Sequence, residues 1–315
     1  MIAGLANAPA ASLLTGGQII PKTTTSLLPI ELSRWRWQVV FATVLTMLMM
    51  ASLVRELFGD ELGALSRRIP TNPLYYMAFC LLYISPPVFD WLIFRKLWRI
   101  PFDGFATLMK KRIANNVVIG YSGEAYFYAW ARARLKLVTA PFGTVKDVSI
   151  LSAVAGNAIT LAMLSLALPF ATELLTPEQL KIVIGSAAVT FAMSLPFILF
   201  FERVFSLPKH TLWLVFAVHC LRLLVGSGLT ALAWHFALPN VSIGMWPLLA
   251  TARMLVSRLP LVPNKDLLFA NFTILLIGRE EAIPELIALT AALALLIHIA
   301  VLVALELSAI IRRLS

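Results

Sequence analysis

Polar side chains interrupt several apolar stretches of this chain, and these interruptions are where binding or catalysis is expected. One stretch, Ile113 to Trp130, reads IANNVVIGYSGEAYFYAW, and a second, Ile243 to Ile277, is broken by arginines, prolines and a Lys-Asp pair. Charged and amide groups are costly in apolar surroundings unless they bind a ligand or one another. Six residues are therefore candidates for substrate binding: Asn115, Asn116, Glu124, Arg222, Arg253 and Arg258.

Glu124 follows the Gly120 to Gly123 break, so it is expected at the start of a short helix. There a carboxylate interacts favourably with the positive end of the helix dipole and with free N–H groups. Between broken helices it could bind a cationic headgroup or hold a proton. The alternative is that Glu124 only caps its own helix, and the sequence leaves both roles open.

Arg222 lies deep in an apolar stretch, three residues after His219, so the two side chains share one helix face. A guanidinium group can hold a lipid phosphate through two hydrogen bonds. A carboxylate partner, Asp90, Glu124 or Glu306, is the structural alternative. The two roles do not exclude each other.

Arg253 and Arg258 precede a proline-containing break that ends in Lys265 and Asp266. A broken helix exposes backbone groups to a cavity, and transporters form their binding sites in this way. The alternative is a polar hairpin tip in which Lys265 and Asp266 pair with each other.

The elements that position these residues are expected to be membrane helices. Of the 315 residues, 60% are hydrophobic and 13% are charged, and the mean hydropathy is +0.86. Soluble domains have a lower apolar fraction, about 45–50%. The apolar residues fall in runs of about 20, the length that crosses a hydrocarbon core, and they lack the alternation of β-barrel strands.

The sequence therefore predicts an all-α integral membrane protein with about six transmembrane helices and two broken, re-entrant hairpins. The expected spans are residues 37–54, 74–94, 148–171, 180–201, 211–237 and 283–311. The hairpins lie at 113–130 and 243–277. Residues 1–33 are expected to form a flexible tail, and residues 34–315 a single membrane domain.

The net charge of +10 follows from the same topology. Basic residues concentrate between Arg95 and Lys146 and near the two ends of the expected membrane domain, which places these segments on the cytoplasmic side. Both termini are then cytoplasmic, in a bacterial inner membrane, and the charge requires no nucleic acid. No histidine, cysteine or carboxylate cluster has the spacing of a metal site, and no nucleotide-binding motif is present, so we expect neither metal nor cofactor.

Two blocks, Asn115 to Ile159 and Arg253 to Gly278, resemble the membrane domain of the lysylphosphatidylglycerol synthase and flippase family. Asn115 or Asn116 followed by Gly123-Glu124 matches one family motif, and Leu259-Pro260, Pro263 and Gly278 match another. The chain departs from the family pattern at Phe127, where an arginine is common, and at Asn264 to Leu267, which replace a glycine-rich loop. The resemblance implies the translocating half of such a protein, without the soluble aminoacyltransferase domain.

We therefore expect a flippase-like translocase, a transporter rather than an enzyme, that moves a polar, amino-acylated or glycosylated lipid. Its partners would be membrane lipids with anionic or amino-acylated headgroups, together with a cytoplasmic synthase or a second copy of the chain. The alternatives are a non-catalytic partner in an envelope-lipid or polysaccharide assembly and a membrane transferase acting on a lipid-linked substrate.

Overall fold

The structure, a computed structural model, describes residues 69–117, 122–134, 142–174, 177–259, 262–277 and 282–314, together with Val44, Met47 and Leu48. Every regular element in these residues is an α-helix, which confirms the expected all-α class. The predicted tail, residues 1–33, and nearly all of the predicted span 37–54 lie outside the described residues.

Four long helices form the frame of the molecule: α3 (Pro73–Trp98), α6 (Phe142–Leu174), α9 (Lys209–Ala237) and α12 (Ala282–Leu314). Each contains a segment long and apolar enough to cross a membrane. These helices coincide with four of the six expected spans. The remaining predicted span in this part of the chain forms helix α7 (Pro177–Leu199), but its apolar portion, Ile184–Pro196, is shorter.

Local sequence signals account for the ends of α3. The Asn72 side chain caps the helix by accepting a 3.0 Å hydrogen bond from the N–H of Leu74, and Pro73 occupies a first-turn position that needs no N–H donor. The helix ends at Arg99, whose φ of 52° lies in the left-handed region and whose N–H bonds the Arg95 carbonyl at 2.9 Å. The chain can therefore turn sharply into the first hairpin.

The two interrupted stretches form helical hairpins, as the sequence predicts. The first consists of α4 (Gly104–Val117) and α5 (Ser122–Arg134), and the second of α10 (Met245–Ser257) and α11 (Lys265–Ile277). At 1.5 Å per residue each of these helices is only about 20 Å long, too short to cross a bilayer. The two helices of each hairpin pack against each other.

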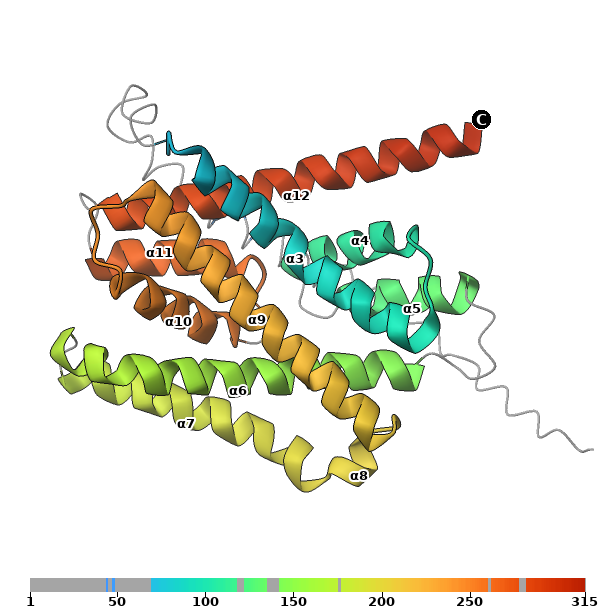
Figure 1. Ribbon diagram of the computed structural model, residues 1–315, viewed down its shortest axis with the longest axis horizontal. Helices are drawn as coiled ribbons and strands as arrows, with labels where there is room; N and C mark the ends of the chain where they lie inside the picture. The colour runs from blue at the N-terminus through green and yellow to red at the C-terminus, as the bar shows by residue number, and fades with distance from the viewer. Residues whose placement is uncertain are drawn as a thin grey trace, which may run out of the picture.

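The hairpins enter the bundle from opposite ends. Figure 1 shows α4 and α5 toward the end of the molecule where α3 finishes and α6 begins, whereas α10 and α11 lie toward the end where α9 finishes and α12 begins. Their tips meet, because the N–H of Asn264 donates a 2.8 Å hydrogen bond to the carbonyl of Asn116. Asn264 has a φ of 44°, a left-handed conformation that asparagine adopts more readily than most residues.

Each hairpin has its own apolar core with the long helices. Around α10 and α11 the core includes Trp234, Trp246 and Ala288, while around α4 and α5 it includes Phe94 and Phe127. A short helix α8 (Phe201–Val204) connects α7 to α9. Apolar packing therefore holds the base of each hairpin and leaves the polar residues to the region where the tips meet.

The hairpin α4–α5 depends on a glycine at its crossing point. A Cβ atom at Gly123 would lie 2.1 Å from the backbone oxygen of Lys111. We expect Gly123→Ala to force the two helices apart and to lower the free energy of unfolding by about 2 kcal/mol, as overpacking typically does. The measurement is the unfolding midpoint of purified protein in detergent. Gly226→Ala in α9 is the control, because a Cβ there meets no described atom within 4 Å; equal destabilisation of the two variants would contradict the prediction.

Candidate functional site

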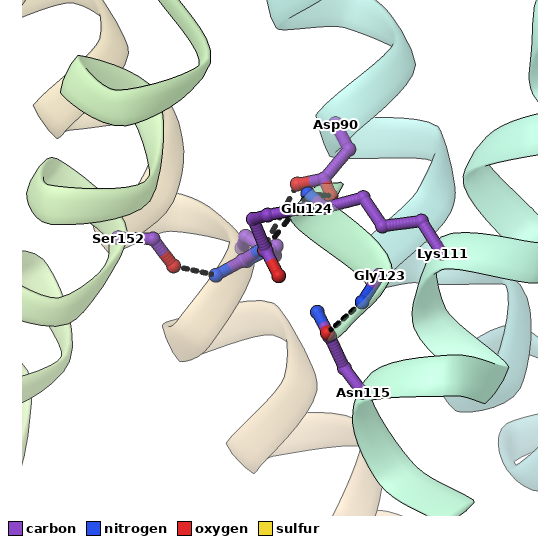
Figure 2. Close-up of polar contacts among 7 residues, drawn as sticks. Asp90, Lys111, Asn115, Gly123, Glu124 and Ser152 are labelled. Carbon is purple, nitrogen blue, oxygen red and sulfur yellow. Dashed lines mark hydrogen bonds and ion pairs between the residues drawn. The ribbon is translucent and has the colours of Figure 1, made fainter. Parts of the chain in front are cut away.

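Five helices bring ionisable and polar side chains together near the middle of the bundle. We call this group the central ion cluster, and its members are Asp90 of α3, Lys111 of α4, Glu124 of α5, Ser152 of α6 and Arg222 of α9. Figure 2 shows the labelled members converging from separate helices. Two of the predicted site residues, Glu124 and Arg222, therefore belong to one arrangement.

Asp90 is the carboxylate on which two cations meet. Its Oδ2 accepts a 2.7 Å hydrogen bond from the Lys111 ammonium group, and its Oδ1 accepts a 2.8 Å bond from Nη1 of Arg222. The Asp90 side chain is only 10% exposed. Arg222 donates a further bond of 2.8 Å to the Ser152 hydroxyl, so the expected carboxylate partner of Arg222 is confirmed as Asp90.

Glu124 occupies the first turn of α5 and is the less satisfied carboxylate of the cluster. Its Oε1 lies 3.5 Å from the Lys111 ammonium group, longer than the Lys111–Asp90 bond. Its Oε2 is buried and has no hydrogen-bond partner among the described residues. Most buried polar atoms have a partner, so this free oxygen is a position at which a ligand or a proton can be held.

Asn115 holds the hairpin closed rather than facing an open site. Its side-chain oxygen accepts a 2.7 Å hydrogen bond from the N–H of Gly123, and Ser122 donates to the carbonyl of Ala114 at 2.9 Å. Figure 2 shows the Asn115–Gly123 bond beside the ion cluster. Through these bonds Asn115 fixes the start of α5, and with it the position of Glu124.

Asn116 belongs to a second polar chain, on another face of α4. Its side-chain nitrogen lies 3.0 Å from Nε2 of His298, whose Nδ1 is 2.9 Å from the Tyr83 hydroxyl. This chain connects α4 to α12 and α3, while the Asn116 carbonyl bonds Asn264 at the other hairpin tip. Asn116 is therefore the residue through which the two tips are linked.

Arg253 and Arg258 of the second hairpin have different surroundings. Arg253 pairs with Asp266 at 2.7 Å, whereas Lys265 donates to the Ser257 carbonyl at 2.6 Å, so the expected Lys265–Asp266 pair is replaced. The guanidinium of Arg258 packs on Gly156, where an added Cβ would lie 1.7 Å from Nη1. Gly156 is one helical turn from Ser152, which places Arg258 next to the ion cluster.

A small cavity of about 40 Å³ lies between the two hairpins and α3, α9 and α12. Its charged lining consists of Arg112, Arg253 and Asp266. Burial lowers the pKa of Arg112 to about 10, a value at which the side chain is still cationic at neutral pH. Burial and the neighbouring Arg258 lower the pKa of Lys265 to about 8, against the opposing effect of Asp266.

Lys111 and Arg112 belong to the candidate site, whereas their place in the basic run between Arg95 and Lys146 predicts a cytoplasmic surface. The structure corrects this assignment, since Lys111 is 7% exposed and Arg112 lines the cavity. A signal was present in the spacing. Lys111 and Asn115, and likewise Arg112 and Asn116, are four residues apart and share helix faces, so each basic residue points with an asparagine toward the interior.

Comparisons of the chain with models of protein families, with curated proteins and with solved structures find no match. Within the described residues, no group of three or more His, Cys, Asp or Glu side chains is arranged to hold a metal ion. In the part of the chain that the structure describes, fold and site together define an α-helical protein with four helices long and apolar enough to cross a membrane and a charged centre beside the first hairpin.

Asp90→Asn tests how strongly the cluster stabilises the fold. The substitution leaves Lys111 and Arg222 without their shared anion, and removing one partner from a buried ion pair typically costs about 3–5 kcal/mol. We expect a loss of this order in the free energy of unfolding, measured by denaturant titration in detergent. Glu306→Gln is the control, because it removes an ion pair with Lys110 in which the Glu306 side chain is 55% exposed. This change is expected to lower the free energy of unfolding by at most about 1 kcal/mol. Similar losses for both variants would contradict the prediction.

Proposed function

We propose that this protein is a flippase-like lipid translocase that moves a polar, amino-acylated or glycosylated lipid across a bacterial inner membrane. The observation that carries the proposal is Glu124, a carboxylate within the helical bundle with one oxygen that no described residue satisfies. Ionisable groups inside membrane proteins are costly and commonly mark a substrate or proton pathway. A free carboxylate oxygen suits the amine of an amino-acylated headgroup, or a proton exchanged for it.

The charge balance around Glu124 supports a headgroup that also carries a phosphate. Cationic side chains outnumber carboxylates where the hairpins meet: Lys111, Arg112, Arg222, Arg253 and Arg258 against Asp90, Glu124 and Asp266. An amino-acylated phospholipid presents an amine and a phosphate together. Glu124 would take the amine, and an arginine would take the phosphate.

The contact between the hairpin tips supports an alternating path. The cavity has room for only a few water molecules, so a headgroup passes only when the tips separate. The bonds from Asn116 to Asn264 and to His298 are single hydrogen bonds between neutral groups. Such bonds contribute about 1 kcal/mol each, so they can be broken and remade during transport.

The distribution of basic residues supports the orientation. Helix α3 ends, α6 and α9 begin and α12 ends at the same end of the molecule (Figure 1). The residues next to these helix ends include Arg95, Lys96, Arg99, Lys146, Arg203 and Lys209. By the positive-inside rule this end, with the C-terminal end of α12, faces the cytoplasm.

The resemblance to the lysylphosphatidylglycerol synthase and flippase family supports the same function. The residues that carry its first motif, Asn115, Asn116 and Gly123-Glu124, lie at the tip of the first hairpin or in the polar centre. Pro260 and Gly278 of the second motif fall outside the described residues. The proposal therefore rests on the first hairpin more than on the second.

Glu124→Gln is the variant that tests this function. The purified protein would be placed in liposomes with headgroup-labelled lipids (anionic, zwitterionic and amino-acylated), and movement between leaflets would be followed by quenching of the label. We expect wild type to move the amino-acylated lipid and Glu124→Gln to lower that rate at least about tenfold, because the amide carries no charge for the amine.

Glu178→Gln is the matched control. Glu178 lies in the first turn of α7 with its side chain 81% exposed, so this change is expected to leave the rate unaltered. Movement of no lipid by folded wild-type protein would overturn the translocase proposal and favour a non-catalytic partner in an envelope assembly. Transport that is indifferent to Glu124→Gln would remove the proposed role of this carboxylate.

A further inference from the structure

The cavity between the hairpins contains a cation that forms no ion pair with any described residue. Its polar lining comprises Tyr83, Arg112, Thr230, Arg253, Asp266 and Thr290, together with the indole N–H of Trp234. The Asp266 carboxylate is bound by Arg253, whose Nε donates a 2.9 Å hydrogen bond to Oδ1 and whose Nη2 lies 2.7 Å from the same oxygen. Of the charged groups in the lining, Arg112 is therefore the one without an ion pair among the described residues.

Arg112 has no ion-pair partner among the described residues. Its guanidinium lies over the ring of Tyr83, 4.5 Å from the ring centre, and this contact uses the face of the group rather than its N–H bonds. Its Nη1 is buried and bonds no described atom. Leaving a buried charged donor unsatisfied is costly, so the arrangement indicates that a ligand anion completes it.

The threonine and tyrosine hydroxyls of the cavity are engaged elsewhere. Thr230 and Thr290 donate their hydroxyl protons to carbonyls of their own helices, at 2.8 and 2.7 Å. The Tyr83 hydroxyl lies 2.9 Å from Nδ1 of His298. Two buried donors of the lining, Nη1 of Arg112 and Nε1 of Trp234, bond no described atom, and of these Arg112 carries the positive charge that an anion requires.

Size and charge narrow the class of ligand. About 40 Å³ accommodates a few water-sized groups, which suits a compact anion such as a phosphate better than a sugar or an aminoacyl group. The lining carries two cations and one carboxylate, so a single negative charge brings it to neutrality. Phenyl and aliphatic side chains, including Phe79, Leu82 and Ile287, form the rest of the wall. An anionic group attached to an apolar body is compatible with such a wall.

We propose that this cavity is a binding site for a phosphate group, held by the Nη1 of Arg112 while Arg253 remains paired with Asp266. Two sources share this chemistry, the phosphodiester of a membrane lipid and free inorganic phosphate. The Arg253 and Asp266 side chains are 30% and 39% exposed, so this pair marks the side from which the phosphate enters. The site does not require that the protein transports lipids, although a lipid phosphate bound here would lie between the hairpins of the proposed translocase.

The test is equilibrium binding to the full-length protein in detergent, for wild type, Arg112→Gln, Arg112→Lys and the control Arg132→Gln. Phosphatidylglycerol would be added in one arm and followed by native mass spectrometry, inorganic phosphate in a second arm by calorimetry, and oleate in a third arm by mass spectrometry. Arg132 is exposed on α5 and distant in sequence from the cavity lining. The lysine variant keeps the positive charge if the glutamine variant fails to fold.

We expect Arg112→Gln to weaken binding of phosphatidylglycerol, or of inorganic phosphate, by roughly tenfold or more, and Arg112→Lys to weaken it less. Dependence on Arg112 in the lipid arm alone identifies the lipid, and dependence in the inorganic phosphate arm identifies free phosphate. Binding of both phosphate ligands that is unchanged in Arg112→Gln overturns the site. If the glutamine variant does not fold, unchanged binding in Arg112→Lys overturns it instead. Oleate binding as strong as the binding of both phosphate ligands also overturns it. Because this assay measures no transport, loss of phosphate binding and failure of translocation are separate outcomes.

Discussion

The carboxylate of Asp90 is the interaction on which the centre of this protein depends. One oxygen binds Lys111 and the other binds Arg222, so a single side chain of α3 fixes α4 and α9 and, through Arg222 and Ser152, α6. A cation buried alone among apolar helices would be strongly destabilising, whereas a shared anion makes both cations tolerable. Lys111 lies 3.5 Å from Oε1 of Glu124, and Oε2 of Glu124 has no hydrogen-bond partner among the described residues. Glu124 is therefore the carboxylate of the cluster that can accept a further hydrogen bond.

Around this centre the apolar packing and the polar contacts of the hairpins lie in different places. The bases of the hairpins pack in two apolar clusters with the long helices, whereas the tips meet through hydrogen bonds of Asn116 and Asn264. Where a helix ends inside a bundle, its free backbone N–H and C=O groups need hydrogen-bond partners from protein or water, and the asparagines at the hairpin tips supply such partners. Within the first hairpin, Glu124 belongs to the central ion cluster, whereas Arg112 lines the cavity between the hairpins.

Much of the architecture could be predicted from the sequence, because long apolar runs and their interruptions are local features. The helices α3, α6, α9 and α12 and both hairpins were predictable, and so was the pairing of Arg222 with one of three carboxylates. The spacing of Lys111 and Arg112 to the two asparagines is a signal that they turn inward, but the sequence could not reveal what they pack against. Lys111 and Arg112 stand in a basic run typical of a cytoplasmic surface, and only the fold of α4 against α3 and α12 buries them. His298 likewise acquires its role from Tyr83 and Asn116, distant in the sequence.

The meeting of the hairpin tips is the central structural claim, and a disulfide between them tests it most directly. With Cys80 and Cys220 replaced by alanine, Asn116→Cys and Asn264→Cys would be combined and oxidised in native membranes. The 2.8 Å backbone hydrogen bond between these residues brings their backbones into direct contact, the close approach that a disulfide requires. We predict rapid, nearly complete cross-linking for this pair and none for Asn116→Cys with Gly185→Cys on α7. Absence of a cross-link in protein that remains folded would contradict the account, since the tips would then not meet.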